Sequence, residues 1–348
     1  MTEWTPILRH LVQNEDLTAK KQAEKYSSHL RKVDLTEAVE AVAFRHAKSN
    51  VGKYTIVSYD LSDISKKSAK KMENIRQVFD WSERKVTNWY TFHWVWVNQM
   101  LIKAEIHDWD KDYLPQIRRE IVTKLFDKLD NKWVLVADRG NDCGQFFRLL
   151  RSEINVNFIV RIKDNRTVIN VKTGVKTKVK NLKEWQYDVY IMNRHWSKAD
   201  KSTIYRLVIQ NHLSDKEPIR LLTTLSKKRF SKNQVVTMYL ERWWVESSFK
   251  RIKGKFNLER IRVLKNQTFL NLIALSLFAM LISTVVFQRI QKANNQLIVW
   301  VLTFYKGFIK KKSLWFNLDS FISYIQMSLP KMLFREQFPP DQLQLFEY

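Results

Sequence analysis

Short apolar runs mark the predicted strands of this chain. The segments 53–60 (KYTIVSYD), 133–138 (WVLVAD) and 157–163 (NFIVRIK) predict buried β-strands. The aromatic and β-branched stretch 89–106 predicts one or two more strands. Apolar residues spaced three and four apart over 114–131 predict an amphipathic helix. Strands and helices in this order predict a mixed α/β sheet flanked by helices.

The pattern changes twice in the second half of the chain. From 164 to 230, short alternating segments broken by Gly, Asn and Asp predict an antiparallel β region. From Ser231 the pattern is helical again, first through SKNQVVTMYLERWWVESSFKRIKGKF and then through the apolar run 269–287. That run is long enough to span a bilayer, but it contains Asn271 and follows a charged segment directly. It is therefore predicted to be a buried central helix.

The charge balance narrows the class of partner. The chain of 348 residues has 60 Lys and Arg against 35 Asp and Glu, which gives a formal net charge of +25. Self-repulsion on this scale destabilises a compact protein, so a polyanionic partner is expected. The basic residues run along the whole chain instead of clustering beside one apolar helix. This distribution favours nucleic acid over a membrane surface.

Cysteine content and the N-terminal segment indicate the compartment. Cys143 is the single cysteine, which excludes an internal disulfide framework and a multi-cysteine zinc site. The N-terminal segment MTEWTPILRHLVQNED lacks the basic-then-apolar pattern of a signal peptide. A cytoplasmic protein with no membrane partner is expected.

Three acidic residues have contexts that are typical of catalytic carboxylates. Asp60 and Asp138 each end a predicted apolar strand, and Glu246 lies in a predicted helix. Residues spaced three or four apart share one face of a helix. The polar face around Glu246 consists of Tyr239, Arg242, Glu246, Lys250 and Lys253.

This set of side chains suits metal-assisted phosphoryl transfer. Two Mg²⁺ ions about 4 Å apart can activate a water or a 3′-hydroxyl and stabilise the leaving oxygen. Magnesium is usually held by carboxylates. Arg242 could bind a phosphate through two parallel hydrogen bonds, and Lys253 could act as a point charge. Each feature also has an ordinary interpretation, since Asp after a strand is a common turn former and such a helix face is usually solvated.

The string YLERWWVESSFKRIK combines these residues in the pattern Y-x2-R-x3-E-x6-K, through Tyr239, Arg242, Glu246 and Lys253. The pattern resembles the signature of bacterial transposases of the insertion-sequence-4 family, which carry a DDE triad on a ribonuclease-H-like fold. IVSYDLSDISKK and VLVADRGND resemble the first-Asp and second-Asp segments of that family. The resemblance covers roughly residues 50–290, and the four-residue signature is specific at its full spacing.

The resemblance implies a chemistry and a role for each residue. Asp60, Asp138 and Glu246 would form the catalytic triad and bind two Mg²⁺ ions, with Mn²⁺ as a substitute. Hydrolytic nicking, release of the element and strand transfer would use this one site, with no covalent protein intermediate and no ATP. The partner would be double-stranded DNA, as transposon ends and target, bound by a homodimer. The residues expected to contact DNA are Tyr239, Arg242, Lys250, Lys253, Arg139, Arg251 and Lys255.

The resemblance also implies a division into regions and a stacking position. A studied relative carries in its inserted domain a Trp that stacks on a flipped base. Here Leu221 follows the matching stretch, Pro218-Ile219-Arg220, and Trp185 or Trp196 could supply the stacking instead. At least one of Trp243 and Trp244 is expected to pack under the active site. The predicted regions are a short helical DNA-contact region (1–50), the first part of a ribonuclease-H-like core (51–163), an inserted β region (164–230), the second part of the core with the catalytic helix (231–290), and a helical C-terminal region (291–348).

Two other functions fit the same residues. An inactive or domesticated transposase could bind DNA through its basic surface alone, although three acids that repel phosphate would serve no purpose in such a protein. A ribonuclease-H-like nuclease could cut DNA without strand transfer.

Overall fold

The chain divides into two compact units, each built from segments that are distant in the sequence. The sheet unit comprises Ala41–Asp63 and Thr91–Ser248, and the helical unit comprises Met1–Glu40, Ile64–Tyr90 and Phe249–Tyr348. The computed structural model describes residues 18–66, 69, 71–80, 84–130, 132–192, 201–211, 217–256, 258–261, 263–292 and 296–333.

Most strands belong to the sheet unit, together with three of the helices, α4, α5 and α6, whereas β2 belongs to the helical unit. The strands are β1 (Ile56–Ser65), β2 (Arg76–Asp80), β3 (Lys85–Val97), β4 (Met100–His107), β5 (Val134–Ala137), β6 (Asn157–Arg161), β7 (Thr167–Asn170), β8 (Lys176–Lys178), β9 (Gln186–Ile191), β10 (Tyr205–Gln210) and β11 (Ile219–Thr223). The helices are α2 (Ala19–Lys32), α3 (Thr36–Lys48), α4 (Leu114–Leu129), α5 (Gly144–Arg148), α6 (Lys232–Leu240), α7 (Trp243–Lys255), α8 (Asn266–Lys292), α9 (Gln296–Lys311) and α10 (Leu318–Leu333).

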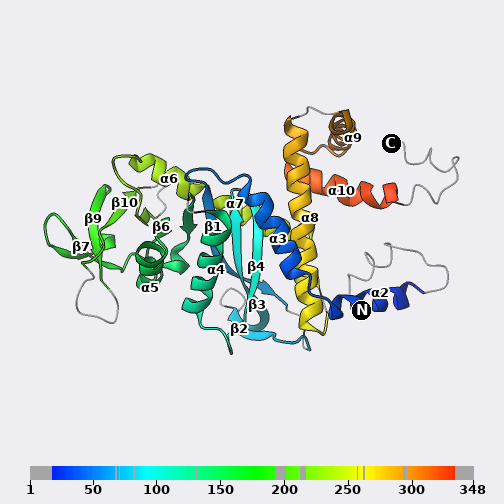
Figure 1. Cartoon of the computed structure of the whole chain (residues 1–348), viewed down its shortest axis with the longest axis horizontal. Helices are drawn as coiled ribbons and strands as arrows, with labels where there is room; N and C mark the ends of the chain where they lie inside the picture. Colours follow the sequence, from blue (N-terminus) through cyan, green and yellow to red (C-terminus); the bar gives the residue numbers. More distant parts are fainter. Residues whose placement is uncertain are drawn as a thin grey trace. The chain divides into compact units, whose positions relative to one another are not determined.

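The sheet of the sheet unit is mixed (Figure 1). Its strand order is β3-β1-β5-β6-β11-β10-β9-β7-β8, and β4 pairs with β3. The pairs β1–β5 and β5–β6 are parallel, whereas the pairs from β6–β11 through β7–β8 are antiparallel. The mixed α/β class predicted from the sequence is therefore confirmed.

Most predicted elements are present with shifted boundaries. The stretch 89–106 falls in two strands, β3 and β4, which turn at Asn98, a residue with a left-handed φ of 53°. The first strand does not end at Asp60, as was predicted, but continues to Ser65. Polar residues in its second half conceal the strand in the sequence, although Ile64 is buried.

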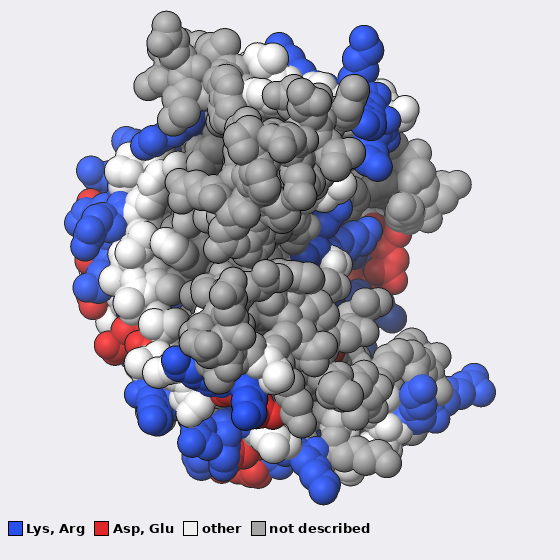
Figure 2. Space-filling view, turned by 90° about the vertical axis from the view of Figure 1, so that its right-hand side faces the viewer, with Lys and Arg blue, Asp and Glu red and all other residues white. Residues whose placement is uncertain are grey.

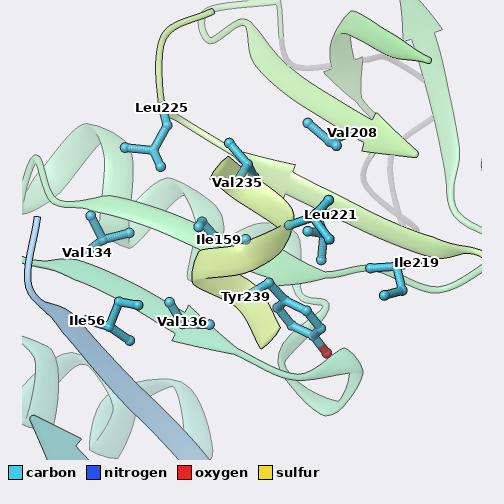
Figure 3. Close-up of a cluster of buried hydrophobic side chains, with 11 residues drawn as sticks. Ile56, Val134, Val136, Ile159, Val208, Ile219, Leu221, Leu225, Val235 and Tyr239 are labelled. Carbon is cyan, nitrogen blue, oxygen red and sulfur yellow. The ribbon is translucent and has the colours of Figure 1, made fainter. Parts of the chain in front are cut away.

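Helix α6 packs on the sheet through a continuous apolar cluster (Figure 3). Alternate residues of β5, Val134 and Val136, face the same side as Ile159 of β6 and Leu221 of β11, and all four are fully buried. Burying one such side chain contributes about 1.5–3 kcal/mol. The cluster also contains Tyr239, so the ring of this predicted site residue belongs to the core.

A buried polar chain links β1 to β3 and β4. The Tyr59 hydroxyl lies 2.6 Å from His93 Nδ1, and His93 Nε2 lies 3.1 Å from His107 Nδ1. Burial lowers the pKa of His93 to about 3, with smaller contributions from His107 and Arg118, and burial also lowers the pKa of His107. Both imidazoles are therefore neutral in the folded protein near pH 7.

We expect the free energy of unfolding to fall as the pH drops below about 6.5, the usual pKa of a histidine in an unfolded chain. Because the pKa of His93 is lower in the folded state, its stabilising effect is complete above pH 6.5 and is lost as the pH falls towards 3. At pH 5.5 the loss from His93 alone is about 1.4 kcal/mol. Urea unfolding at pH 7.5 and 5.5 measures the free energy of unfolding of the wild type and of His93→Gln. The difference between the two pH values should be smaller for the variant.

The matched control is His29→Gln, because His29 is exposed on α2. This variant should keep the full pH dependence of the wild type. A His93→Gln protein with unchanged pH dependence would show that the buried imidazole is not the source of the acid sensitivity.

Helix α8 organises the helical unit. It is the one described helix that is long and apolar enough to cross a membrane by length and composition, and 56% of the qualifying segment is buried. Asn271 within it is fully buried, donates to the Leu30 and Val33 carbonyls, and accepts from Leu35 N–H at 2.8 Å. These hydrogen bonds satisfy backbone groups at the C-terminal end of α2 and just after it. Asn271 thus acts as a buried polar residue of a protein interior.

On the face of the molecule shown in Figure 2, the visible charged side chains of the described residues are more often basic than acidic. Lys and Arg side chains lie around much of the visible surface, and Asp and Glu form smaller patches between them.

Candidate active site

The register of two parallel strands brings Asp60 beside Asp138. Strands β1 and β5 pair from Ile56↔Val134 to Tyr59↔Ala137, and the next residue on each is one of the two acids. Neighbouring strands lie about 4.8 Å apart, so consecutive positions in register stay adjacent. The two acids predicted from separate segments therefore occupy adjacent positions, Asp138 directly after β5 and Asp60 midway along β1.

The surroundings of Asp60 raise its pKa. Burial raises the pKa of Asp60, and the neighbouring charge of Asp138 raises it further, to about 7. Arg242 opposes this shift, and the charge of Glu246 adds to it. All three acids of the predicted triad thus contribute to one electrostatic environment, in which negative charge is only partly compensated.

The helix predicted through 231–256 is broken at Glu241 and Arg242. Helix α6 ends at Leu240 and α7 begins at Trp243, and Arg242 N–H donates to the Tyr239 carbonyl at 3.0 Å. The prediction of one unbroken helix from Tyr239 to Lys253 is therefore wrong, although Arg242 still lies next to both Tyr239 and Glu246. No Gly or Pro marks the break, and the turn carries an arginine that is mostly buried instead of solvated.

Arg242 connects the acids. Its Nη2 lies 3.4 Å from Glu246 Oε1, and its Cζ lies 5.6 Å from the centre of the Tyr239 ring. Burial lowers the pKa of Arg242, but Tyr239, Asp60 and Asp138 more than offset burial, and the net pKa is raised. The guanidinium therefore stays charged between the Asp pair and Glu246.

The carboxylates of Asp60, Asp138 and Glu246 are suitable ligands for a divalent cation, but they do not converge on one metal position. Among the described residues, no group of three or more His, Cys, Asp or Glu side chains is arranged to hold a metal ion. Glu246 is directed to Arg242, and its side chain is 62% exposed. Burial first and the charge of Asp138 second raise the pKa of Asp60, and a hard cation that takes oxygen ligands would favour the ionised form of this acid.

Asn141, which the sequence analysis did not single out, holds Asp138 in place. Its Nδ2 donates to Asp138 Oδ1 at 2.9 Å, and its own Oδ1 accepts from Arg118 Nη2 at 3.0 Å. Gly140 N–H donates to the same Asp138 oxygen at 2.9 Å, and a Cβ at this glycine would lie only 3.1 Å from that oxygen. Asn141 and Arg118 are both buried, so this chain of hydrogen bonds is shielded from water. The string DRGND contained the signal, since an amide three residues after an acid can reach it across a tight turn.

Replacing Asn141 with Leu is expected to weaken Mg²⁺-dependent cleavage by about 10–100-fold, the usual cost of losing a partner that orients a metal ligand. Asp138 would lose one of the two donors to its Oδ1, and Arg118 would lose a buried acceptor. The measurement is the Mg²⁺ concentration that gives half-maximal cleavage, which should rise, together with the melting temperature. A half-maximal concentration equal to that of the wild type would contradict the orienting role.

The predicted DNA contacts differ in their accessibility. Lys250 and Arg139 are exposed, although Arg139 Nη1 lies 3.5 Å from Glu217. In the helical unit, Lys253 lies 3.5 Å from Glu259, and Lys255 donates to Ser323 at 2.6 Å. These contacts leave Lys250 as the most accessible of the predicted lysines on α7.

Arg251 requires a correction. The sequence predicted a phosphate contact, but its side chain is 6% exposed and its Nε donates to Asp319 Oδ1 at 2.6 Å. Its guanidinium is thus engaged inside the helical unit, where it ties α7 to α10. A partner so distant in the sequence gives no local signal.

The aromatic predictions are also changed by the structure. Trp243 and Trp244 are 51% and 48% exposed, so the expectation that one packs under the site is wrong. Leu221 is fully buried in the core, whereas Trp185 is 62% exposed. Trp196 lies outside the described residues.

Residues 52–282 match the family described as the transposase DDE domain. This match covers more than half of the chain, and the chain belongs to this family. It includes Asp60, Asp138 and Glu246.

One similar solved structure is the cryo-EM structure of the piggyBac transposase synaptic complex with hairpin DNA, at 9% sequence identity and a TM-score of 0.49. The similarity covers 85% of this chain and 57% of that one, so this chain spans little more than half of that relative's length. Comparison with curated proteins gave no significant match.

Proposed function

We propose that this protein is a DNA transposase that cuts and rejoins DNA by metal-dependent phosphoryl transfer at Asp60, Asp138 and Glu246. The observation that carries the proposal is the β1–β5 register, which makes Asp60 and Asp138 neighbours in a chain of the transposase DDE family. The signature through Tyr239, Arg242, Glu246 and Lys253 supports the insertion-sequence-4 type.

The triad would hold two Mg²⁺ ions, or Mn²⁺ in their place. When bound, these ions supply activation of the attacking oxygen and stabilisation of the leaving oxygen. Glu246 would turn from Arg242 towards the Asp pair, since its 3.4 Å contact is long and its side chain is exposed. Arg242, which stays charged, would then be available to donate to the phosphate.

Asn141 and Gly140 would keep Asp138 in a fixed orientation through its Oδ1. Tyr239 would support Arg242 from the core, because its ring is buried in the cluster beneath α6. The exposed side chains of Lys250 and Arg139 would contact the DNA backbone. Lys253 and Lys255 would do so only after exchanging their present partners.

The remaining assignments belong to the same proposal. The regions 51–163 and 231–290 would form a ribonuclease-H-like core, with 164–230 as a β region inserted between the second and third acids. The antiparallel pairing of β7 to β11 supports that insertion. The region 1–50 would contact DNA, a homodimer would act on two transposon ends, and the protein would work in the cytoplasm.

The test uses purified protein, Mg²⁺ and a plasmid carrying the DNA that flanks this gene, with its terminal inverted repeats. Strand-transfer products that disappear with EDTA and return with Mn²⁺ are expected. Nicks without joined products would instead indicate a nuclease. Salt-sensitive binding without any cleavage would indicate a protein that only binds DNA.

A further inference from the structure

A lysine-rich hairpin lies at one end of the sheet unit, where β7 and β9 are seen in Figure 1. Residues 165–183 contain no Asp or Glu. The five lysines of this segment, here called the hairpin lysines, are all exposed: Lys172, Lys176, Lys178, Lys180 and Lys183.

Hydrogen bonds within the hairpin stabilise the backbone that carries the hairpin lysines. Asn170 Oδ1 accepts from Lys172 N–H at 2.9 Å, and Gly174 N–H donates to the Asn170 carbonyl at 2.8 Å. Gly174 has a φ of 71°, which other residues adopt only with strain. Val168 and Val179 are fully buried and anchor the hairpin to the sheet. The ammonium groups therefore extend from a fixed scaffold.

The hairpin lysines differ from the other basic residues nearby. Lys227 pairs with Asp188, Lys232 with Glu184, and Arg220 with Asp164. Within the part of the chain that the structure describes, none of the hairpin lysines forms a salt bridge. Five unneutralised charges on one short segment repel one another, and a polyanion would remove that cost.

Lysines on an edge strand also have an ordinary purpose, because they prevent strands of other molecules from pairing with the edge. This explanation fits Lys176 and Lys178, which lie on the edge strand β8. It does not fit Lys172 in the turn, Lys180 in the following 3₁₀ turn, or Lys183 beyond it. The positive charge extends past the strand that would need protection.

We propose that the hairpin lysines form a surface that binds the phosphate backbone of duplex DNA away from the catalytic site. The inference rests on the proposed function, because DNA is the partner. Strand β8 is six strands from β5 in the sheet order, which corresponds to about 29 Å at about 4.8 Å per strand. At 3.4 Å per base pair, this distance is about eight or nine base pairs from the scissile phosphate. The surface would supply sequence-independent affinity for flanking DNA.

The test compares two triple variants with equal loss of charge. The first is Lys172→Gln/Lys176→Gln/Lys178→Gln. The control is Lys53→Gln/Lys128→Gln/Lys132→Gln, three exposed lysines of the same unit. Two of the control residues precede β1 and β5, at the end opposite to Asp60 and Asp138.

Binding of a labelled 30-bp duplex of arbitrary sequence is measured by fluorescence anisotropy across a salt series, with EDTA present so that cleavage plays no part. The hairpin variant should bind about 10–100-fold more weakly, and its salt slope should be shallower by up to about 0.9 for each lost phosphate contact. The control should bind within about threefold of the wild type, since the proposed DNA-binding surface does not include its lysines. A hairpin variant with wild-type affinity and slope would overturn the inference.

Acetylation footprinting of the wild-type protein gives a second measurement that needs no variant. The same duplex should protect the hairpin lysines but not Lys53, Lys128 or Lys132, and equal modification with and without DNA would overturn the inference. Failure of the proposed function would look different. A protein that binds the duplex through these lysines but never cuts DNA would leave this surface intact and remove only the catalytic proposal.

Discussion

The Glu246→Gln variant is expected to lose Mg²⁺-dependent strand cleavage by on the order of 1,000-fold or more, while its DNA affinity stays equal or increases. The amide keeps the size of the side chain but removes the negative charge that a Mg²⁺ ligand supplies. It also removes a charge that repels DNA phosphate, and it releases Arg242 from its ion pair. The measurement is the initial rate of nicking of plasmid DNA carrying the terminal repeats, with binding measured separately in EDTA.

Glu241→Gln is the matched control for this variant. Glu241 is exposed and lies at the C-cap of α6, in the turn between α6 and α7. It is not part of the proposed triad. Its replacement should leave the cleavage rate within about twofold, because surface substitutions of this kind have small effects. A Glu246→Gln protein that cuts DNA like the wild type would exclude Glu246 from the triad.

The sequence was sufficient to predict β1, β5 and β6 and to place Asp138 directly after β5. It did not show that β1 continues past Asp60, nor that Arg76–Asp80 forms β2. Short apolar runs such as 133–138 have one simple interpretation, and carboxyl ends of neighbouring parallel strands meet at one edge of a sheet. What the pattern could not supply was the register. The pairing of Tyr59 with Ala137, which makes Asp60 and Asp138 neighbours, depends on the packing of both strands.

The break between α6 and α7 could not be predicted from local preferences. Glu241 and Arg242 are good helix formers, and the helical spacing continues across them. Tertiary contacts decide the outcome, because the turn is stabilised by a mostly buried Arg242 that meets Tyr239 and Glu246. Arg251 illustrates the same limit, since its partner Asp319 is remote in the sequence.

The segment VLVADRGND contains a second acid, Asp142, whose role is structural. Of the substitutions considered, loss of Asp142 is expected to lower the stability of the protein most. Asp142 has no exposed side-chain surface and accepts from Arg166 Nε at 2.9 Å and from Lys163 N–H at 2.9 Å. Arg166 also donates to the Met192 carbonyl at 3.3 Å. The pair thus fastens the loop after Asp138 to the start of the antiparallel strands.

Replacing Asp142 with Ala should lower the free energy of unfolding by about 3–5 kcal/mol, because it leaves a buried guanidinium without its counter-charge. The double variant Asp142→Leu/Arg166→Met should recover most of this loss, since replacing a whole buried ion pair by apolar residues is often neutral. Urea unfolding of the wild type, of the single variants Asp142→Leu and Arg166→Met, and of the double variant completes the cycle and yields the coupling energy. Asp142→Ala is measured beside them.

The same variants separate stability from catalysis. Asp142 directly follows Asn141, which orients Asp138, so a loop released from Arg166 should also hold Asp138 less firmly. The double variant should therefore regain stability without regaining its full cleavage rate, because apolar packing does not restore the hydrogen bonds that fix the loop. A double variant that recovers both would show that Asp142 serves folding alone, and that Asn141 orients Asp138 independently of the ion pair.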